Sequence, residues 1–123
     1  MIEKKGNTTE ELVDTLIEGL QKNKAIDIVK IDLRNIESSV CKYFLICHGT
    51  STTHVNGIAA SAEEYVRKTI NEKPWRFEGH QNSQWILLDY SDVVVHVFQK
   101  EYRDFYRLEN LWADATVTKI QNA

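Results

Sequence analysis

The stretch QWILLDYSDVVVHVF, residues 84–98, predicts two β-strands joined by a short turn. Apolar and β-branched residues fill both halves, and Tyr90, Ser91 and Asp92 form the break between them. A connection this short joins strands that run in opposite directions. The chain therefore contains an antiparallel hairpin, around which the other elements can be placed.

A capped helix is predicted near the amino terminus, over residues 9–22. Thr8 and Glu11 have the spacing of a capping box, in which each side chain bonds the other residue's backbone N–H. Apolar residues recur on one face of this helix, at Leu12, Leu16, Ile17 and Leu20.

Two strands are predicted next. Residues 25–33 are β-branched and partly alternating. Residues 43–48, YFLICH, form an uninterrupted apolar run that is typical of a strand buried on both faces.

A second helix follows the loop GTSTTH and can be capped by Ser51 or Thr52. It must end before Pro74, which cannot continue a helix. A short strand is predicted within residues 75–80, and the hairpin comes next. With a last helix, the order is αββαβββα, and we expect an α/β (α+β) fold: a mixed five-stranded sheet with flanking helices. The step from Tyr43 to Trp75 is the candidate for a parallel crossover.

The composition suits one globular domain. The 123 residues are 42% hydrophobic and 27% charged, so a single domain over residues 1–123 is expected, with a core at about 9–115. The net charge of −3 disfavours a protein that wraps nucleic acid and suits a basic protein partner.

The cysteines and the amino-terminal residues indicate in which cellular compartment the protein is expected. Cys41 and Cys47 form no CxxC pattern and are predicted to be reduced and buried. We find no apolar core of a signal peptide and no apolar run of membrane-spanning length. The cytoplasm is the expected compartment, without membrane association.

The last predicted helix carries more apolar surface than one sheet can cover. On a helical wheel of residues 101–112, apolar side chains span an arc of roughly 220°, whereas a helix lying on a sheet needs about 100°. Arg103, Arg107 and Asn110 make the narrow polar face, and Glu109 falls inside the apolar arc. Either the carboxy-terminal tail folds back over the surplus, or another protein binds it.

A nucleotide-binding or nucleotidyltransferase-like enzyme is the alternative that the sequence leaves open. The loop that begins at Gly49 and ends at Thr53 lies between a strand and a helix, where anions are favoured. It lacks the spacing of a Walker loop, and the chain contains no acid-x-acid pair for catalytic metal ions. His96 is interpreted as a hydrogen-bonded strand histidine, and no catalytic constellation or cofactor is predicted.

Four segments together resemble one known family. The segments YFLICHGTSTTHV, the Glu78-Gly79 pair, WILLDYSDVVVHVF and RDFYRLENLW follow the order and spacing of the iojap, or ribosomal silencing factor, family. This resemblance covers residues 9–115 and implies a fold similar to a nucleotidyltransferase without its catalytic carboxylates.

The resemblance implies a binding protein and not an enzyme. The family docks on the large ribosomal subunit against ribosomal protein fourteen (uL14), blocks joining of the small subunit and represses translation when nutrients are scarce. A role in large-subunit biogenesis and a homodimer of the free chain are also implied.

Carried over by position, the docking residues lie on the first hairpin strand and on the last helix. They are Trp85, Leu87, Leu88, Asp89, Tyr106, Leu108, Glu109 and Trp112. Apolar anchors would supply most of the affinity, and Asp89 or Glu109 would pair with basic residues of the ribosomal protein. The sequence departs from the family pattern at Lys42 and Thr53, both near the loop and outside this set.

Overall fold

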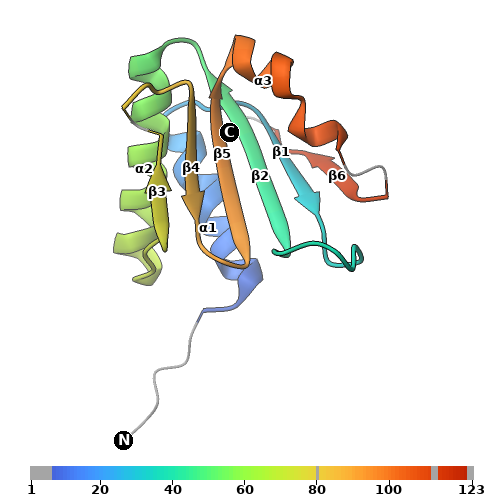
Figure 1. The fold of residues 1–123 in the computed structure, drawn as a ribbon. Coiled ribbons are helices and arrows are strands. Elements are labelled where there is room, and N and C mark those ends of the chain that lie inside the picture. Colours follow the sequence, from blue (N-terminus) through green and yellow to red (C-terminus); the bar gives the residue numbers. More distant parts are fainter. Residues whose placement is uncertain (1–6, 80, 112–113, 122–123) are drawn as a thin grey trace, which may run out of the picture.

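Helices are interspersed with runs of two or three strands in the computed structural model, which describes residues 7–79, 81–111 and 114–121. The elements are α1 (Thr9–Lys22), β1 (Ile26–Asp32), β2 (Tyr43–Gly49), α2 (Thr52–Ile70), β3 (Arg76–Glu78), β4 (Trp85–Asp89), β5 (Val93–Gln99), α3 (Lys100–Tyr106), a 3₁₀ turn (Leu108–Asn110) and β6 (Thr116–Lys119). The predicted order is confirmed through α3, and β6 is an addition (Figure 1).

The strands form one mixed sheet in the order β3-β4-β5-β2-β1-β6. The predicted hairpin is confirmed, because β4 and β5 pair antiparallel and the turn closes with Tyr90 N–H donating to Val93 O at 2.8 Å. The central pair, β2 and β5, is parallel. The crossover from β2 through α2 leads to β3 at the far edge, which pairs antiparallel with β4.

The predicted count of five strands is wrong, because the segment after the last helix adds a sixth. Residues 116–119 pair antiparallel with β1, and Ile120 N–H donates to Ile28 O at 2.8 Å. All four residues of β6 are exposed. An edge strand of this kind buries no apolar side chain, so it leaves no hydrophobic run in the sequence.

The predicted helix over residues 101–112 is also corrected. Helix α3 ends at Tyr106, and Arg107 adopts a left-handed conformation with φ 49°. The chain then turns through the 3₁₀ segment, so the apolar arc of a continuous helix does not form. Arg103, expected on the polar face, is instead buried.

The first helix begins as predicted. Thr8 Oγ1 accepts the Glu11 N–H at 3.0 Å and Glu11 Oε1 accepts the Thr8 N–H at 2.8 Å, which completes the capping box. Helix α1 then packs closely on α2, because a Cβ on Gly19 would lie 2.9 Å from the Ala62 Cα. Glycine at this position allows the two backbones to approach.

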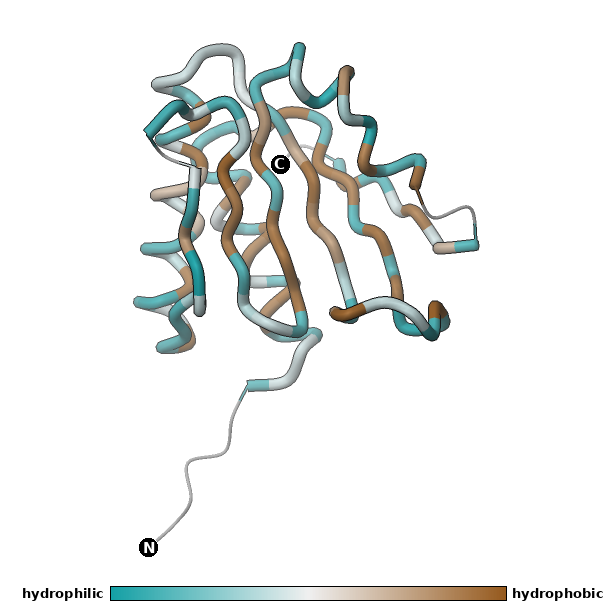
Figure 2. Tube along the Cα trace, viewed as in Figure 1, coloured by the Kyte–Doolittle hydropathy of each residue, from teal (hydrophilic) through white to brown (hydrophobic). Residues whose placement is uncertain are grey.

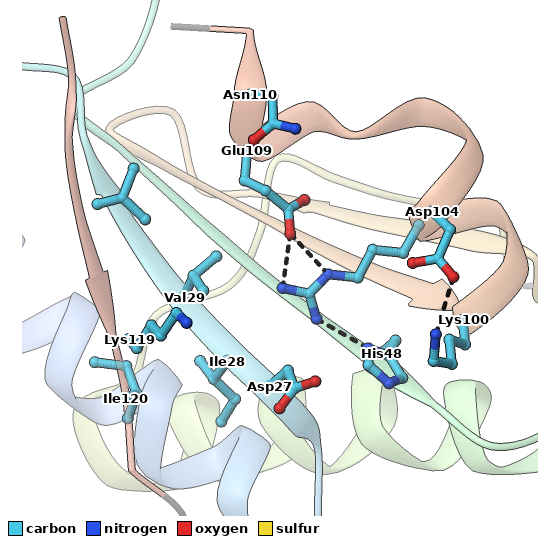
Figure 3. A pocket seen from close by; sticks show the side chains of 12 residues that line it. Asp27, Ile28, Val29, His48, Lys100, Asp104, Glu109, Asn110, Lys119 and Ile120 are labelled. Carbon is cyan, nitrogen blue, oxygen red and sulfur yellow. Dashed lines mark hydrogen bonds and ion pairs between the residues drawn. The ribbon is translucent and has the colours of Figure 1, made fainter. Parts of the chain in front are cut away.

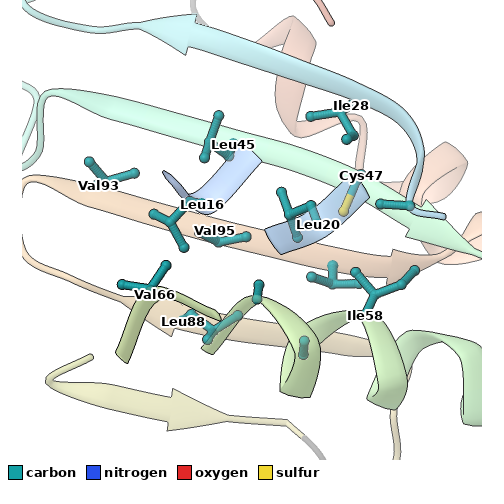
Figure 4. Packing of buried hydrophobic residues seen from close by; sticks show 14 of the residues in the cluster. Leu16, Leu20, Ile28, Leu45, Cys47, Ile58, Val66, Leu88, Val93 and Val95 are labelled. Atoms are coloured by element: carbon teal, nitrogen blue, oxygen red, sulfur yellow. The ribbon is translucent and has the colours of Figure 1, made fainter. Parts of the chain in front are cut away.

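Helices α1 and α2 cover one face of the sheet and enclose the main core (Figure 4). Leucines of α1, aliphatic residues of α2 and inward residues of β2, β4 and β5 meet there. The central strands are the most hydrophobic part of the chain, whereas β3 is mostly hydrophilic (Figure 2). Cys41 and Cys47 are free and buried, as predicted, and burial raises their thiol pKa values to about 11 and about 12.

The opposite face of the sheet is only partly covered. Helix α3 contacts β5 and β2 from this side (Figure 1). A smaller apolar cluster lies beneath the helix and the 3₁₀ turn. We call this side the open face. Within the described part of the chain, none of the helices has the length and apolar character needed to cross a membrane.

Candidate functional site

The alternation of β4 separates the predicted docking residues into two groups. Trp85, Leu87 and Asp89 are partly exposed, whereas Leu88 between them is fully buried in the main core. Successive side chains of a strand point to opposite faces, so the exposed three lie on the open face. Leu88 is therefore part of the core and not of a surface.

An aromatic row joins α3 to the open face. The ring of Tyr106 lies 4.8 Å from that of Trp85, centroid to centroid, although the two residues are far apart in the sequence. Phe105 extends the row outward at 5.1 Å from Tyr106, and it is 78% exposed. The row continues inward through His96 to Phe44, whose rings lie 4.7 Å apart.

His96 holds the indole of Trp85 in place. Trp85 Nε1–H donates to His96 Nδ1 at 3.0 Å, which confirms the interpretation of His96 as a hydrogen-bonded strand histidine. Burial lowers the pKa of His96 to about 4, so the imidazole is neutral and its Nδ1 is free to accept. The hydrogen bond to the buried His96 thus fixes the orientation of the Trp85 ring.

Asp89 supplies a carboxylate beside the aromatic row. Its Oδ1 accepts the Ser91 N–H at 2.8 Å, a contact within the hairpin turn. Among the described residues no side chain bonds its other oxygen, and the carboxylate is part of the open face. We define the docking surface as Trp85, Leu87, Asp89 and Tyr106.

The remaining predicted residues lie elsewhere. Leu108 is partly buried against the smaller apolar cluster. Glu109 faces Arg103, and its Oε2 accepts from Arg103 Nε and Nη2, at 3.0 Å each. Trp112 lies outside the described residues.

The loop considered for nucleotide binding is closed by its own hydrogen bonds. His54 Nδ1 accepts the Thr50 N–H at 2.9 Å, and Ser51 Oγ accepts the His54 N–H at 3.1 Å. A Cβ on Gly49 would lie 3.1 Å from His54 Nδ1 and from the Val55 amide nitrogen. A phosphate at this loop would have to displace these contacts.

A cavity of about 660 Å³ lies between α3, β1 and β6, near the carboxyl end of β2 (Figure 3). Crevices at this end of a parallel pair often bind ligands. Two of the three cations that line it are already paired, Arg103 with Glu109 and Lys100 with Asp104. His48, also in the lining, has its pKa lowered by burial and by Arg103. The cavity is therefore poorly suited to an anion.

Sequence reasoning did not identify Phe44 as a neighbour of the docking surface, nor Arg103 as a buried residue. Phe44 belongs to an uninterrupted apolar run, in which no alternation shows which side chains face outward. The one indication for Arg103 was a weak one, an opposite charge at Glu109 six residues further along the chain. The two side chains are in contact because helix α3 ends between them.

A family model described as ribosomal silencing factor during starvation matches residues 6–123. A ribosomal silencing factor RsfS of Halalkalibacterium halodurans is 35% identical over 93% of this chain and 96% of its own length. One from Bacillus subtilis is 42% identical over 79% of this chain and 80% of its own length. A mouse protein named mitochondrial assembly of ribosomal large subunit protein 1 is 30% identical over 81% of this chain and 44% of its own length.

Two solved structures are similar to this chain over most of its length. A crystal structure from Bacillus halodurans matches with a TM-score of 0.76 and 33% identity, covering 92% of this chain and 99% of that one. A structure from Chromobacterium violaceum matches with a TM-score of 0.82 and 28% identity, covering 95% and 97%. The chain therefore belongs to the ribosomal silencing factor family, a family of ribosome-associated translation regulators.

Proposed function

We propose that this protein binds the large ribosomal subunit at ribosomal protein fourteen and blocks joining of the small subunit. The observation that carries the proposal is the docking surface, where Trp85, Leu87 and Asp89 of β4 lie beside Tyr106 of α3. The names of the bacterial and mouse relatives, which refer to ribosomal silencing and large-subunit assembly, support a partner on the large subunit.

The docking surface has the composition of a binding hot spot. Aromatic side chains supply a large contact area, and Trp85 and Tyr106 are already packed against each other before any partner arrives. A fixed surface loses little conformational freedom on binding. The carboxylate of Asp89 and the net charge of −3 favour a partner with a basic surface.

The proposed action is occlusion, which requires no chemistry. A folded domain of 14.3 kDa at the face where the two subunits meet prevents their contact by its volume. The relatives are named as silencing or assembly factors, which is consistent with a protein that is not an enzyme. A role in large-subunit assembly would use the same surface. A homodimer of the free chain is a separate proposal, which sedimentation equilibrium would test.

Sedimentation of purified ribosomal subunits tests the proposal. The protein is expected to migrate with the large subunit and to reduce the joined fraction. Trp85→Ala should weaken binding by about 30-fold, the effect of losing a central aromatic anchor. Tyr65→Ala is the matched control, because Tyr65 lies on α2, on the other side of the sheet, and its hydroxyl bonds Glu18. A wild-type protein that stays at the top of the gradient would contradict the proposal.

The nucleotide alternative can be tested on the free protein. Because His54 and Ser51 already satisfy amides of the loop, ATP with Mg²⁺ should leave the thermal unfolding midpoint unchanged. A saturable rise in the midpoint, lost in a Gly49→Val variant that remains folded, would favour a nucleotide-binding protein instead.

A further inference from the structure

Helix α3 is held on the sheet by a buried charged side chain as well as by the apolar contacts of Tyr102 and Tyr106. Of its seven residues, all of which are described, only Arg103 is buried, with 6% of its surface exposed. A helix of this length is not stable alone in water. The contacts of Arg103 therefore add to those of Tyr102 and Tyr106 in setting the position of the helix.

The guanidinium of Arg103 joins α3 to three other segments, the 3₁₀ turn, β1 and β2. Nε and Nη2 each donate to Glu109 Oε2 at 3.0 Å, which links α3 to the 3₁₀ turn. Nη1 donates to the Ile26 carbonyl at 3.3 Å and to His48 Nδ1 at 2.9 Å, which links α3 to β1 and β2. An arginine can make these contacts together because its donors form a planar fork.

The contact with Glu109 closes a turn that local geometry disfavours. Arg107, between the two residues, has φ 49°, in the left-handed region that non-glycine residues rarely adopt. A strained residue persists only where surrounding contacts over-determine it. The pairing of Arg103 with Glu109 spans this residue and supplies such a contact.

We propose that Arg103 is a positioning residue, which presents Tyr106 to the partner by holding α3 and the 3₁₀ turn on the sheet. This inference rests on the proposed function of the docking surface. It changes the role of Glu109, whose carboxylate serves Arg103 and not a basic residue of the partner. Asp89, whose carboxylate is bonded only to the Ser91 amide among the described residues, is then the group that recognises a cation of the partner.

Hydrogen exchange of the free protein tests the positioning directly. The amides of Arg107, Asn110 and Leu111 donate backbone bonds within the segment that Arg103 holds. In Arg103→Met they should exchange at least about tenfold faster, while amides of the main core, such as Leu45, keep their protection. Arg103→Lys should show a smaller increase, and it decides the test if the methionine variant does not fold.

Lys100→Gln is the matched control for exchange, because Lys100 lies one turn earlier on α3 and is exposed. It should leave the exchange of the segment unchanged. Unchanged exchange in both Arg103 variants would overturn the proposal, as would an equal rise across the whole sheet.

Binding to the large subunit then separates the two carboxylates. Glu109→Gln keeps an acceptor for Arg103, so its affinity should stay within about threefold of wild type. Asp89→Asn should lose about tenfold and show a weaker dependence on salt. The reverse pattern, with Glu109→Gln losing affinity and salt dependence, would overturn the proposal. Failure of the wild-type protein to bind would reject the proposed function, and the exchange result would still decide the role of Arg103.

Discussion

The two faces of the sheet are stabilised in different ways. The face under α1 and α2 is filled mostly with aliphatic side chains, with Tyr43 and Tyr90 among them. The open face carries aromatic rings held by buried polar contacts, His96 beneath Trp85 and Arg103 beneath α3. Apolar packing is non-directional, whereas hydrogen bonds fix orientation. The helix-covered face therefore provides most of the stability, and the open face provides a surface of defined shape.

The adjacent leucines of β4 test this difference most strongly. Leu88 is fully buried in the main core, so Leu88→Ala should lower the free energy of unfolding by about 3 kcal/mol, from lost burial and the cavity left behind. Urea unfolding followed by circular dichroism measures this loss. A cost below about 1 kcal/mol would show that the helix-covered face is less important to stability than its packing implies.

Acid should weaken the protein through His96. Its pKa is about 4 in the folded protein and about 6.5 in the unfolded chain, so the unfolded state binds the proton first as pH falls. Stability is full above pH 6.5, decreases toward pH 4 and is about 2 kcal/mol lower at pH 5 than at pH 7. Protonation would also place a second donor against Trp85 Nε1–H.

Urea unfolding at pH 7 and pH 5 measures this effect, with His96→Gln as the comparison. The variant should lose the share of the pH dependence that His96 carries. His48, whose pKa is also lowered, adds a loss of the same sign that remains in the variant. Asp32 and Asp104 lose their contributions only below pH 3.8, outside this window. An identical pH dependence in both proteins would contradict the assignment to His96.

Local patterns predicted most of the fold. The capping box at Thr8, the hairpin turn and the helix stop before Pro74 each depend on neighbouring residues, and the structure confirms them. Strand β6 was missed because its partner is β1, far away in the sequence, and its side chains are exposed. Pairing between distant segments leaves no local pattern.

The candidate site was only partly predictable. Trp85, Leu87 and Asp89 were predicted only through the family resemblance, which also included Leu88, because the run WILL contains no polar residue that shows which leucine faces inward. The break at Arg107 carries neither glycine nor proline, so the sequence indicated a continuous helix. The pairing of Arg103 with Glu109 spans that break, so a continuous helix did not indicate it.

Leu87→Ala can be compared with Leu88→Ala, because the two adjacent leucines of β4 lie on opposite faces of the sheet. Leu87 is partly exposed on the open face, so its truncation should cost about 1 kcal/mol of stability or less. Binding to the large subunit should nevertheless weaken by about tenfold, because an apolar anchor is lost from the docking surface. Unfolding and subunit binding, measured on Leu87→Ala and Leu88→Ala together, check both expectations. A Leu87 variant with wild-type affinity would remove this residue from the surface.

The smallest effect is expected at an exposed ion pair of α3. Lys100 Nζ lies 2.9 Å from Asp104 Oδ2, and both side chains are more than half exposed. Solvent screens such a pair and its ordering costs side-chain entropy, so Lys100→Gln should change stability by less than about 0.5 kcal/mol. Arg103, one turn further along the same helix, carries the same charge in a buried position with several fixed partners. If urea unfolding showed equal losses for Lys100→Gln and Arg103→Lys, burial would not be what distinguishes the two cations, and charge alone would hold α3 in place.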